Sequence, residues 1–271
     1  MVTFKPLFCR IKYLRAVLIT LFISMFMVGP VLAVEITSQE QAEKLIGEIS
    51  KRIDGNRGDA TLFVQRGAVY FKLRDFDSAV EDYTRAIKIN DKLDQAWFGR
   101  GMAQARLGYI DEGIADLSVF IKRNPNSSLA YTKRGVRYLW KGDKESARKD
   151  LTRAVDLDPN NAEAHDDLGV VLAQAGKYRE AIAHFRLTVR LDPTYQKGHH
   201  NLAMALYVVE KDELALARVN IAQKLDPDAR NTLLLKSEIL NAMGRVAEAG
   251  KLKDEAMFLQ EGNWSERAPI E

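Results

Sequence analysis

Four residues in the second half of the chain have side chains that could bind a metal. They are His165, Asp166, His199 and His200. Zinc binds imidazole and carboxylate groups at about 2 Å and takes about four of them. His165 and His199 stand 34 residues apart at equivalent positions, which places their backbones about 8 to 10 Å apart on neighbouring packed helices. We therefore expect packed side chains here, with neither a bound metal nor a cofactor.

Arginine and aspartate recur at the same 34-residue spacing between residues 66 and 150. The arginines are Arg66, Arg100 and Arg134, and the aspartates are Asp82, Asp116 and Asp150. Both types disappear together further along the chain, where Leu168 and His184 stand at the corresponding positions. This joint change predicts ion pairs between helices rather than a ligand site. An arginine could meet the aspartate of its own unit or that of a neighbouring unit.

The common catalytic signatures are missing from the sequence. It contains no glycine-rich phosphate loop, no Gly-x-Ser-x-Gly segment and no Cys-x-x-Cys pair. The usual means of binding nucleotides, activating a serine or doing thiol chemistry are therefore absent. We expect the protein not to be an enzyme.

The residues described so far belong to a repeat of 34 residues. Small residues recur at its position 8, beginning with Gly67, and at position 20, whereas positions 4 and 24 are mostly large. Small residues let two helices approach closely while the large ones fill the space beside them. Glycine at position 15 and proline at position 32, each in four units, end the two helices. Each unit is predicted to be a pair of packed helices.

This pattern resembles that of the tetratricopeptide repeat family, which has the same small positions, an aromatic residue at position 4 and a proline at position 32. The resemblance implies an all-α, right-handed superhelical solenoid of helix-turn-helix units. Six units are predicted, at 60–93, 94–127, 128–161, 162–195, 196–229 and 230–261, the last of them degenerate. Residues 34–59 are predicted to form an N-terminal capping helix and linker, and residues 262–271 a flexible tail.

The resemblance also implies where a partner binds. In the family, positions 2, 5, 9 and 12 of the first helices line a concave groove that holds a peptide or helix of another protein. The predicted groove residues are Val64, Ala68, Phe71, Phe98, Met102, Ala105, Thr132, Val136, Leu139, Asp166, Val170, His200, Met204 and Tyr207. Family members that clamp a C-terminal carboxylate carry Lys, Asn and Arg at positions 5 and 9 of their first units, and this chain does not.

The predicted groove changes from apolar to polar along its length. Its first three units are apolar, whereas Glu163, Asp166 and Asp167 follow in the fourth unit and Lys197 in the fifth. This profile predicts an amphipathic helix or apolar peptide as the ligand, with a basic group near Asp166. The apolar strip could instead be covered by residues 34–53, by the C-terminal tail or by a second subunit.

The first 33 residues have the pattern of a secretory signal peptide. Four basic residues precede an apolar run over residues 16–28, and Ala33 fits a cleavage site. The run is shorter than the roughly 20 residues that cross a bilayer. We expect cleavage after Ala33, a periplasmic mature chain and no stable membrane insertion after cleavage. An uncleaved membrane anchor and a secreted protein are the alternatives.

The mature chain is expected to be nearly neutral. Removing the four basic residues of the first 33 from the total of 40 leaves 36 Lys and Arg against 37 Asp and Glu. Such a balance disfavours a partner bound through its phosphate backbone, so no nucleic acid is expected. We expect a scaffold or adaptor of the cell envelope that binds a protein or peptide, the alternative being a self-associating scaffold that forms a homo-oligomer.

Overall fold

The computed structural model describes residues 38–259, and all regular structure in this range is helical. The predicted signal peptide and the predicted tail lie outside the described residues. The helices are α1 (Gln39–Gly55), α2 (Ala60–Lys72), α3 (Phe76–Ile89), α4 (Asp94–Arg106), α5 (Ile110–Arg123), α6 (Ser128–Lys141), α7 (Lys144–Leu157), α8 (Ala162–Gln174), α9 (Tyr178–Leu191), α10 (Gln196–Val208), α11 (Asp212–Leu225), α12 (Arg230–Ala242) and α13 (Val246–Met257). No helix in this range is long and apolar enough to cross a membrane.

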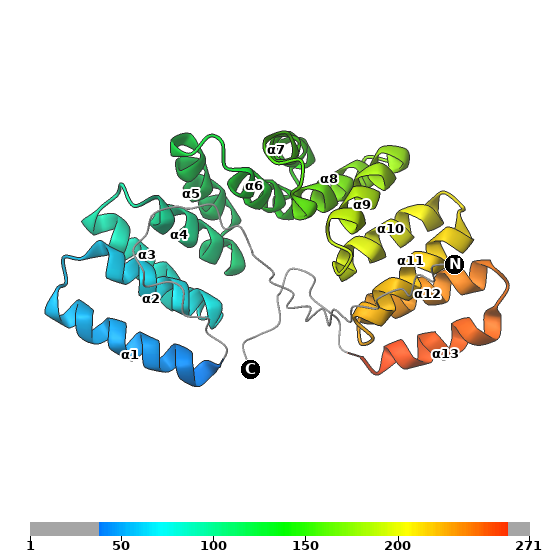
Figure 1. Ribbon diagram of the computed structural model, residues 1–271, viewed down its shortest axis with the longest axis horizontal. Coiled ribbons are helices and arrows are strands. Elements are labelled where there is room, and N and C mark those ends of the chain that lie inside the picture. Colours follow the sequence, from blue (N-terminus) through cyan, green and yellow to red (C-terminus); the bar gives the residue numbers. More distant parts are fainter. Residues whose placement is uncertain (1–37, 260–271) are drawn as a thin grey trace, which may run out of the picture. The chain divides into compact units, whose positions relative to one another are not determined.

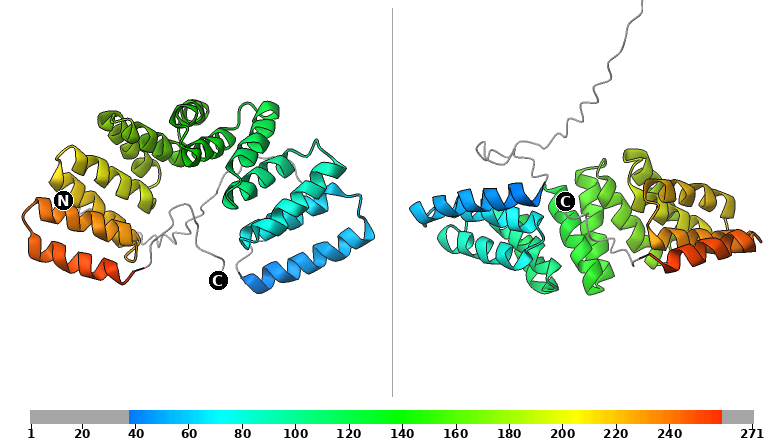
Figure 2. Two further views of the ribbon diagram at one scale, coloured as in Figure 1. Left: turned by 180° about the vertical axis from the view of Figure 1, so that it is seen from behind. Right: turned by 90° about the horizontal axis from the view of Figure 1, so that it is seen from below.

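Consecutive helices pack in pairs, from α2 with α3 to α12 with α13. Each second helix also packs against the first helix of the next pair, so the pairs follow one another in chain order, with α1 and α13 at the two ends (Figures 1 and 2). First helices of neighbouring pairs contact one another, whereas the second helices within residues 38–259 do not. The first helices therefore form the inner side of a curved solenoid. This arrangement confirms the predicted all-α solenoid of helix pairs.

The turn inside every pair uses one residue with a left-handed backbone. In four pairs this residue is a glycine, such as Gly142 with φ of 85°. In the first and fifth pairs the same position holds Arg74 and Glu210, with φ of 65° and 57°. A side chain in this conformation costs roughly 1 kcal/mol relative to glycine, so the turn geometry persists even where the sequence lacks the favourable residue.

The two helices of a pair approach most closely at their small residues. A Cβ atom added to Gly101 of α4 would lie 2.9 Å from the carbonyl oxygen of Gly113 in α5. A Cβ atom at Gly113 would lie 2.7 Å from the carbonyl oxygen of Gly101. Because the obstacle is backbone on both sides, neither position can hold a side chain without moving the helices apart. Large residues such as Leu117 fill the space beside this contact and are fully buried.

The repeated arginines bind the aspartates of their own units. In the third unit, Nε and Nη2 of Arg134 donate to the two carboxylate oxygens of Asp150 at 2.7 and 2.8 Å. The Nη1 atom donates to the hydroxyl of Ser118 in the preceding unit, at 2.9 Å. The first two units make the same contacts through Arg66 and Arg100. The arginines thus tie each pair to itself and to its predecessor.

The N-terminal helix α1 takes part in this series. Its Ser50 hydroxyl accepts a hydrogen bond of 2.9 Å from Nη1 of Arg66, as hydroxyls of later second helices do for the next arginines. Within the described residues α1 packs only against α2. It buries Ala42, Ile49 and Ile53 there. The helix therefore stands where the second helix of a preceding unit would stand, and it covers the first side of the first unit.

Candidate functional site

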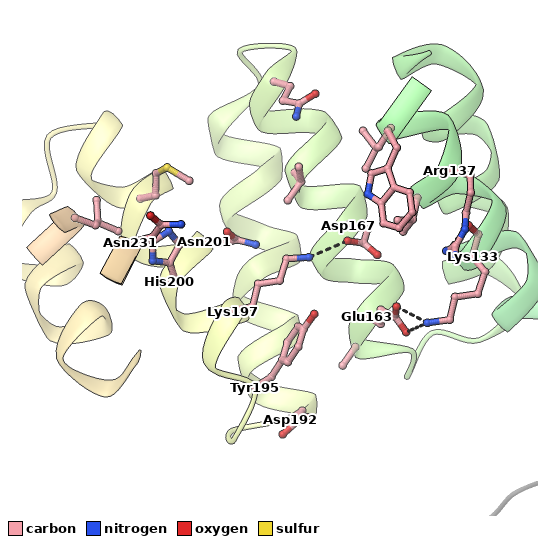
Figure 3. A pocket seen from close by; sticks show the side chains of 18 of the residues that line it. Lys133, Arg137, Glu163, Asp167, Asp192, Tyr195, Lys197, His200, Asn201 and Asn231 are labelled. Carbon is pink, nitrogen blue, oxygen red and sulfur yellow. Dashed lines mark hydrogen bonds and ion pairs between the residues drawn. The ribbon is translucent and has the colours of Figure 1, made fainter. Parts of the chain in front are cut away.

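A groove of about 1370 Å³ runs along the inner side of the solenoid. It is lined by five first helices, α4, α6, α8, α10 and α12, together with two residues of the turn between α9 and α10 (Figure 3). In α8 the lining residues are Ala162, Glu163, Asp167, Val170 and Gln174. The last four stand at positions 2, 6, 9 and 13 of the unit, which form one stripe along an α-helix.

The observed stripe differs from the predicted one in two of its four positions. Met102, Val136, Val170 and Met204, all at position 9, line the groove as expected. Position 5 lies mostly between neighbouring first helices, and Thr132 and Asp166 there are fully buried and do not line the groove. His200 at position 5 lines it while being only 8% exposed. Leu139 at position 12 also lines it.

The other predicted groove residues are buried or half-buried, and most of them pack against neighbouring helices. Ala105 is buried. Phe98 packs on Phe120 of α5, with ring centroids 5.1 Å apart. The remaining residues, Val64, Ala68, Phe71 and Tyr207, are half-buried and are not part of the groove lining. Much of the expected apolar strip is thus covered by the protein's own helices, because small changes of angle around a helix move a side chain from a groove to a helix contact.

Val64 and Phe71 belong to the core that α2 shares with neighbouring helices. Both pack against the buried cluster that includes Ile49 of α1, and Phe71 also meets the ring of Phe76 with centroids 5.3 Å apart. The segment 34–53 was one of the covers proposed for the apolar strip. Its described part, in α1, buries its own apolar face in this cluster.

Two ion pairs cross the floor of the groove between neighbouring first helices. The Nζ atom of Lys133 donates to both carboxylate oxygens of Glu163 at 2.5 and 2.7 Å. The Nζ atom of Lys197 lies 3.2 Å from a carboxylate oxygen of Asp167 (Figure 3). The same atom lies 3.1 Å from a carboxylate oxygen of Asp166. Each pair joins position 6 of one unit to position 2 of the next, and opposite charges at this 30-residue spacing were a signal available in the sequence.

Burial sets the charge balance of this network. It raises the pKa of Asp167 to about 6, against the opposing attraction of Lys197. Burial likewise raises the pKa of Asp166, whose carboxylate accepts two hydrogen bonds from Asn201 at 2.9 and 3.1 Å. Burial works against the charge of Lys197, but the two aspartates outweigh it and raise the pKa of this amine. The expected contact between Asp166 and a basic ligand group is therefore replaced by contacts within the protein.

The histidines considered as metal ligands are packed separately. His165 stacks on His184 with Nδ1 atoms 2.9 Å apart, and its Nε2 lies 3.0 Å from the carbonyl oxygen of Pro159. His199 makes the equivalent contact with the carbonyl oxygen of Pro193 at 3.1 Å. Within residues 38–259 no group of three or more His, Cys, Asp or Glu side chains is arranged to hold a metal.

The end of the groove nearest the N-terminus contains an arginine that sequence reasoning did not single out. Arg137 is 2% exposed, and its Nη1 donates to the carbonyl oxygen of Lys133 at 3.2 Å. Its Cζ lies 4.9 Å from the ring centroid of Trp140, and Cζ of Arg106 lies 5.7 Å from the same ring. Burial, followed by repulsion from Arg106, lowers the pKa of Arg137 to about 10.

Three segments of the chain match family models described as tetratricopeptide repeat, at residues 60–93, 95–127 and 132–195. The chain belongs to the tetratricopeptide repeat family. The matched segments include α2, α3, α5 and α7 to α9 and most of α4 and α6. Of the five first helices that line the groove, α4, α6 and α8 belong to these segments, and α10 and α12 follow them in the chain.

Several solved structures share the fold of this tetratricopeptide repeat protein. A chain of the APC/C hetero-tetramer Cut9–Hcn1 is 17% identical with a TM-score of 0.72, and the match covers 80% of the present chain but only 43% of that one. YrrB, described as a TPR protein with an unusual peptide-binding site, is 22% identical with a TM-score of 0.54, covering 68% and 95%.

PilF of Pseudomonas aeruginosa is 16% identical with a TM-score of 0.66, and the match covers 72% of this chain and 89% of PilF. No curated protein matches the sequence significantly. At identities this low, the structural matches show the shared solenoid fold and nothing about the ligand. The ligand of this tetratricopeptide repeat protein is therefore inferred from its own groove.

Proposed function

We propose that this protein is a non-enzymatic scaffold or adaptor that binds a peptide segment of another protein in the groove of its first helices. The observation that carries the proposal is the continuous groove over α4 to α12, which presents apolar side chains beside charged ones. Val136, Leu139 and Val170 are half-buried there, and Met204 is 45% exposed. Apolar contacts give affinity to a bound segment, and polar groups beside them fix its orientation.

We further propose that the protein acts in the periplasm or cell envelope. The basic residues, the apolar run at 16–28 and Ala33 support export by a cleaved signal peptide. An adaptor exported in this way meets the periplasmic segments of envelope proteins. An uncleaved anchor would keep the same groove at the membrane surface, and the two cases differ in the N-terminal residue of the chain found in the cell.

A self-associating scaffold is the second candidate function. It is favoured by apolar side chains that are exposed on the second helices or directly after them. Leu214 of α11 is 52% exposed, Val246 of α13 is 63% exposed, and Phe258 just after α13 is 89% exposed. Exposed apolar groups of this size are common at contacts between subunits.

The experiment compares one groove variant with one matched variant on a second helix of the same unit. Tagged protein, Met204→Glu protein and Leu214→Glu protein are used to capture partners from a cell-envelope extract. We expect the Met204→Glu substitution to remove the partner and the Leu214→Glu substitution to keep it. Light scattering over a range of concentrations is run on all three. The self-associating scaffold predicts a mass that rises with concentration in the wild type and in Met204→Glu protein but stays that of a monomer in Leu214→Glu protein. That result would count against the adaptor.

A further inference from the structure

The ion-paired arginines of this solenoid share one pattern of hydrogen bonds. In Arg66, Arg100 and Arg134 the edge formed by Nε and Nη2 donates to both oxygens of an aspartate, while Nη1 donates to a hydroxyl. This edge matches the spacing of carboxylate oxygens and gives the strong bidentate pair typical of arginine. The pattern shows how the protein satisfies a buried guanidinium when it has a structural role.

Arg137 lies one turn beyond Arg134 in α6 and has the same edge without an acceptor. Its Nη1 donates to the carbonyl oxygen of Lys133 at 3.2 Å, but neither Nε nor Nη2 has a hydrogen-bond partner within residues 38–259. The residue is only 2% exposed. A buried cation without a carboxylate costs folding free energy, and the loss of hydration lowers its pKa to about 10. Stability therefore does not account for this arginine.

The nearby acidic residues of the groove are already engaged. Glu163 accepts both hydrogen bonds of Lys133, and Asp167 is paired with Lys197. The second arginine at this end, Arg106, adds positive charge and stacks on the same indole of Trp140 as Arg137 does. This end of the groove thus combines two neighbouring guanidinium groups with the unused bidentate donor edge of Arg137, and this edge complements a carboxylate.

Apolar groups line the same groove as Arg137, on the helices to either side of it as well as on its own helix. Met102 of α4, Val136 of α6 and Val170 of α8 all line the groove with Arg137. Trp140 is 40% exposed and presents an aromatic face to it. Because the groove extends past Arg137 toward both α4 and α8, a bound chain can continue on either side, which suits an acidic side chain within a segment better than a chain end.

We propose that the groove binds a peptide segment with an Asp or Glu side chain whose carboxylate pairs with the Nε and Nη2 edge of Arg137. The inference rests on the proposed function and names the chemistry of its ligand. An apolar residue next to the acidic one packs on Trp140 and Val136. The indole stacks on the guanidinium in the unbound groove, so it turns aside as the carboxylate enters, and binding changes the fluorescence of Trp140.

The test begins with selection from a display library of random 12-residue peptides with both ends linked or blocked. We expect the purified protein to enrich Asp or Glu at one position beside an apolar residue. A selected peptide is then synthesised with its acidic residue and with the matching amide, and the affinities are compared by fluorescence anisotropy. The acidic form is expected to bind about 10- to 100-fold more tightly, as for a hydrogen-bonded charge.

Variants assign this preference to one side chain. In Arg137→Gln protein the acidic and amide peptides are expected to bind equally, and the change in Trp140 fluorescence seen in the wild type is expected to be absent. Arg153→Gln removes one positive charge from an exposed site on α7 and should keep the full preference. Arg137→Lys keeps the charge without the bidentate edge and should lose most of the preference, so it serves if the Gln variant folds poorly.

Each outcome separates the inference from the function on which it rests. Selected peptides without an acidic preference, whose binding is lost in Met204→Glu protein, would overturn the inference and leave the peptide-binding groove standing. Dependence on a free C-terminal carboxylate alone would also overturn it. If no selected peptide depends on either Arg137 or Met204, both the inference and the proposed function are wrong.

Discussion

Two arginines one turn apart in α6 should respond in opposite ways to the same substitution. Arg134 is paired with the carboxylate of Asp150, whose side chain is 5% exposed. Arg137 is more deeply buried, at 2% exposure, and has no carboxylate partner among residues 38–259. Methionine has a similar length to the aliphatic part of arginine and no charge. The two substitutions therefore differ mainly in whether a buried carboxylate remains without its partner.

The expected magnitudes follow from the two environments. Arg134→Met leaves the Asp150 carboxylate buried without its cation and also removes the hydrogen bond to Ser118, which we expect to cost about 3 to 5 kcal/mol. Arg137→Met loses one hydrogen bond to a carbonyl, worth about 1 kcal/mol. It also removes a buried and unpaired charge. The net change at Arg137 should lie between zero and about 2 kcal/mol of stabilisation.

Chemical and thermal denaturation followed by circular dichroism measure both changes. For a domain of this size, the midpoint should fall by about 10 °C for Arg134→Met and stay level or rise by a few degrees for Arg137→Met. Wild-type helicity should be kept at low temperature in both. Equal destabilisation by the two substitutions would show that the guanidinium of Arg137 is satisfied in the unbound protein, and it would refute the argument that this residue is reserved for a ligand.

Other predictions follow from packing, titration and export. Gly101→Leu forces a side chain against the backbone of α5 and should destabilise the fold by about 1 to 3 kcal/mol or more. A Cβ atom at Gly250 would have no other atom within 4 Å, so Gly250→Ala should stabilise α13 by about 0.5 to 1 kcal/mol. Denaturation midpoints measure both changes. Burial lowers the pKa of His200 from 6.5 to about 4. The wild type should therefore lose about 3 kcal/mol of folding stability relative to His200→Gln protein as the pH falls from 6.5 to 4, because the unfolded chain takes up the proton first. Denaturation at pH 7 and at pH 4.5 measures most of this loss. The intact mass of the protein isolated from cells should correspond to a chain that starts at Val34, and a mass that includes residues 1–33 would contradict cleavage.

The solenoid could be predicted from the sequence because its determinants are repeated. A small residue such as Gly101 must recur wherever two backbones touch, and this requirement leaves a 34-residue period that local variation does not hide. The turn shows the limit of such reasoning. Arg74 and Glu210 adopt the left-handed conformation without being glycine, because the packed helices on either side fix the backbone between them.

The groove was harder to predict because it depends on angles of rotation around each helix. Positions 5 and 6 are adjacent in sequence, yet Asp166 lies wholly between helices while Asp167 lines the groove. The period of 34 residues is the same for both, so the repeat alone does not separate them. Opposite charges at position 6 of one unit and position 2 of the next, as in Lys133 and Glu163, indicate that these two positions face the groove.

The role of Arg137 could be predicted only in part from the sequence. Arg134 belongs to the arginine series at position 7 and has a carboxylate partner, whereas Arg137 stands at position 10, where the other units have apolar residues: Val69, Ala103, Val171, Ala205 and Ile239. This spacing marks Arg137 as unusual, but its unused donor edge appears only when the surrounding side chains are placed. Unsatisfied groups are properties of the packed structure, and they mark candidate binding residues that a repeat pattern does not show.

The most direct test of the peptide-binding groove is photo-crosslinking in living cells. A benzoylphenylalanine side chain is placed at Met204 in the groove or at Leu214 on the second helix of the same unit, and adducts are identified by mass spectrometry. The proposed function predicts an adduct between position 204 and a short segment of another protein, with none at position 214. Adducts that form only at position 214, or only with a second copy of this chain, would contradict it.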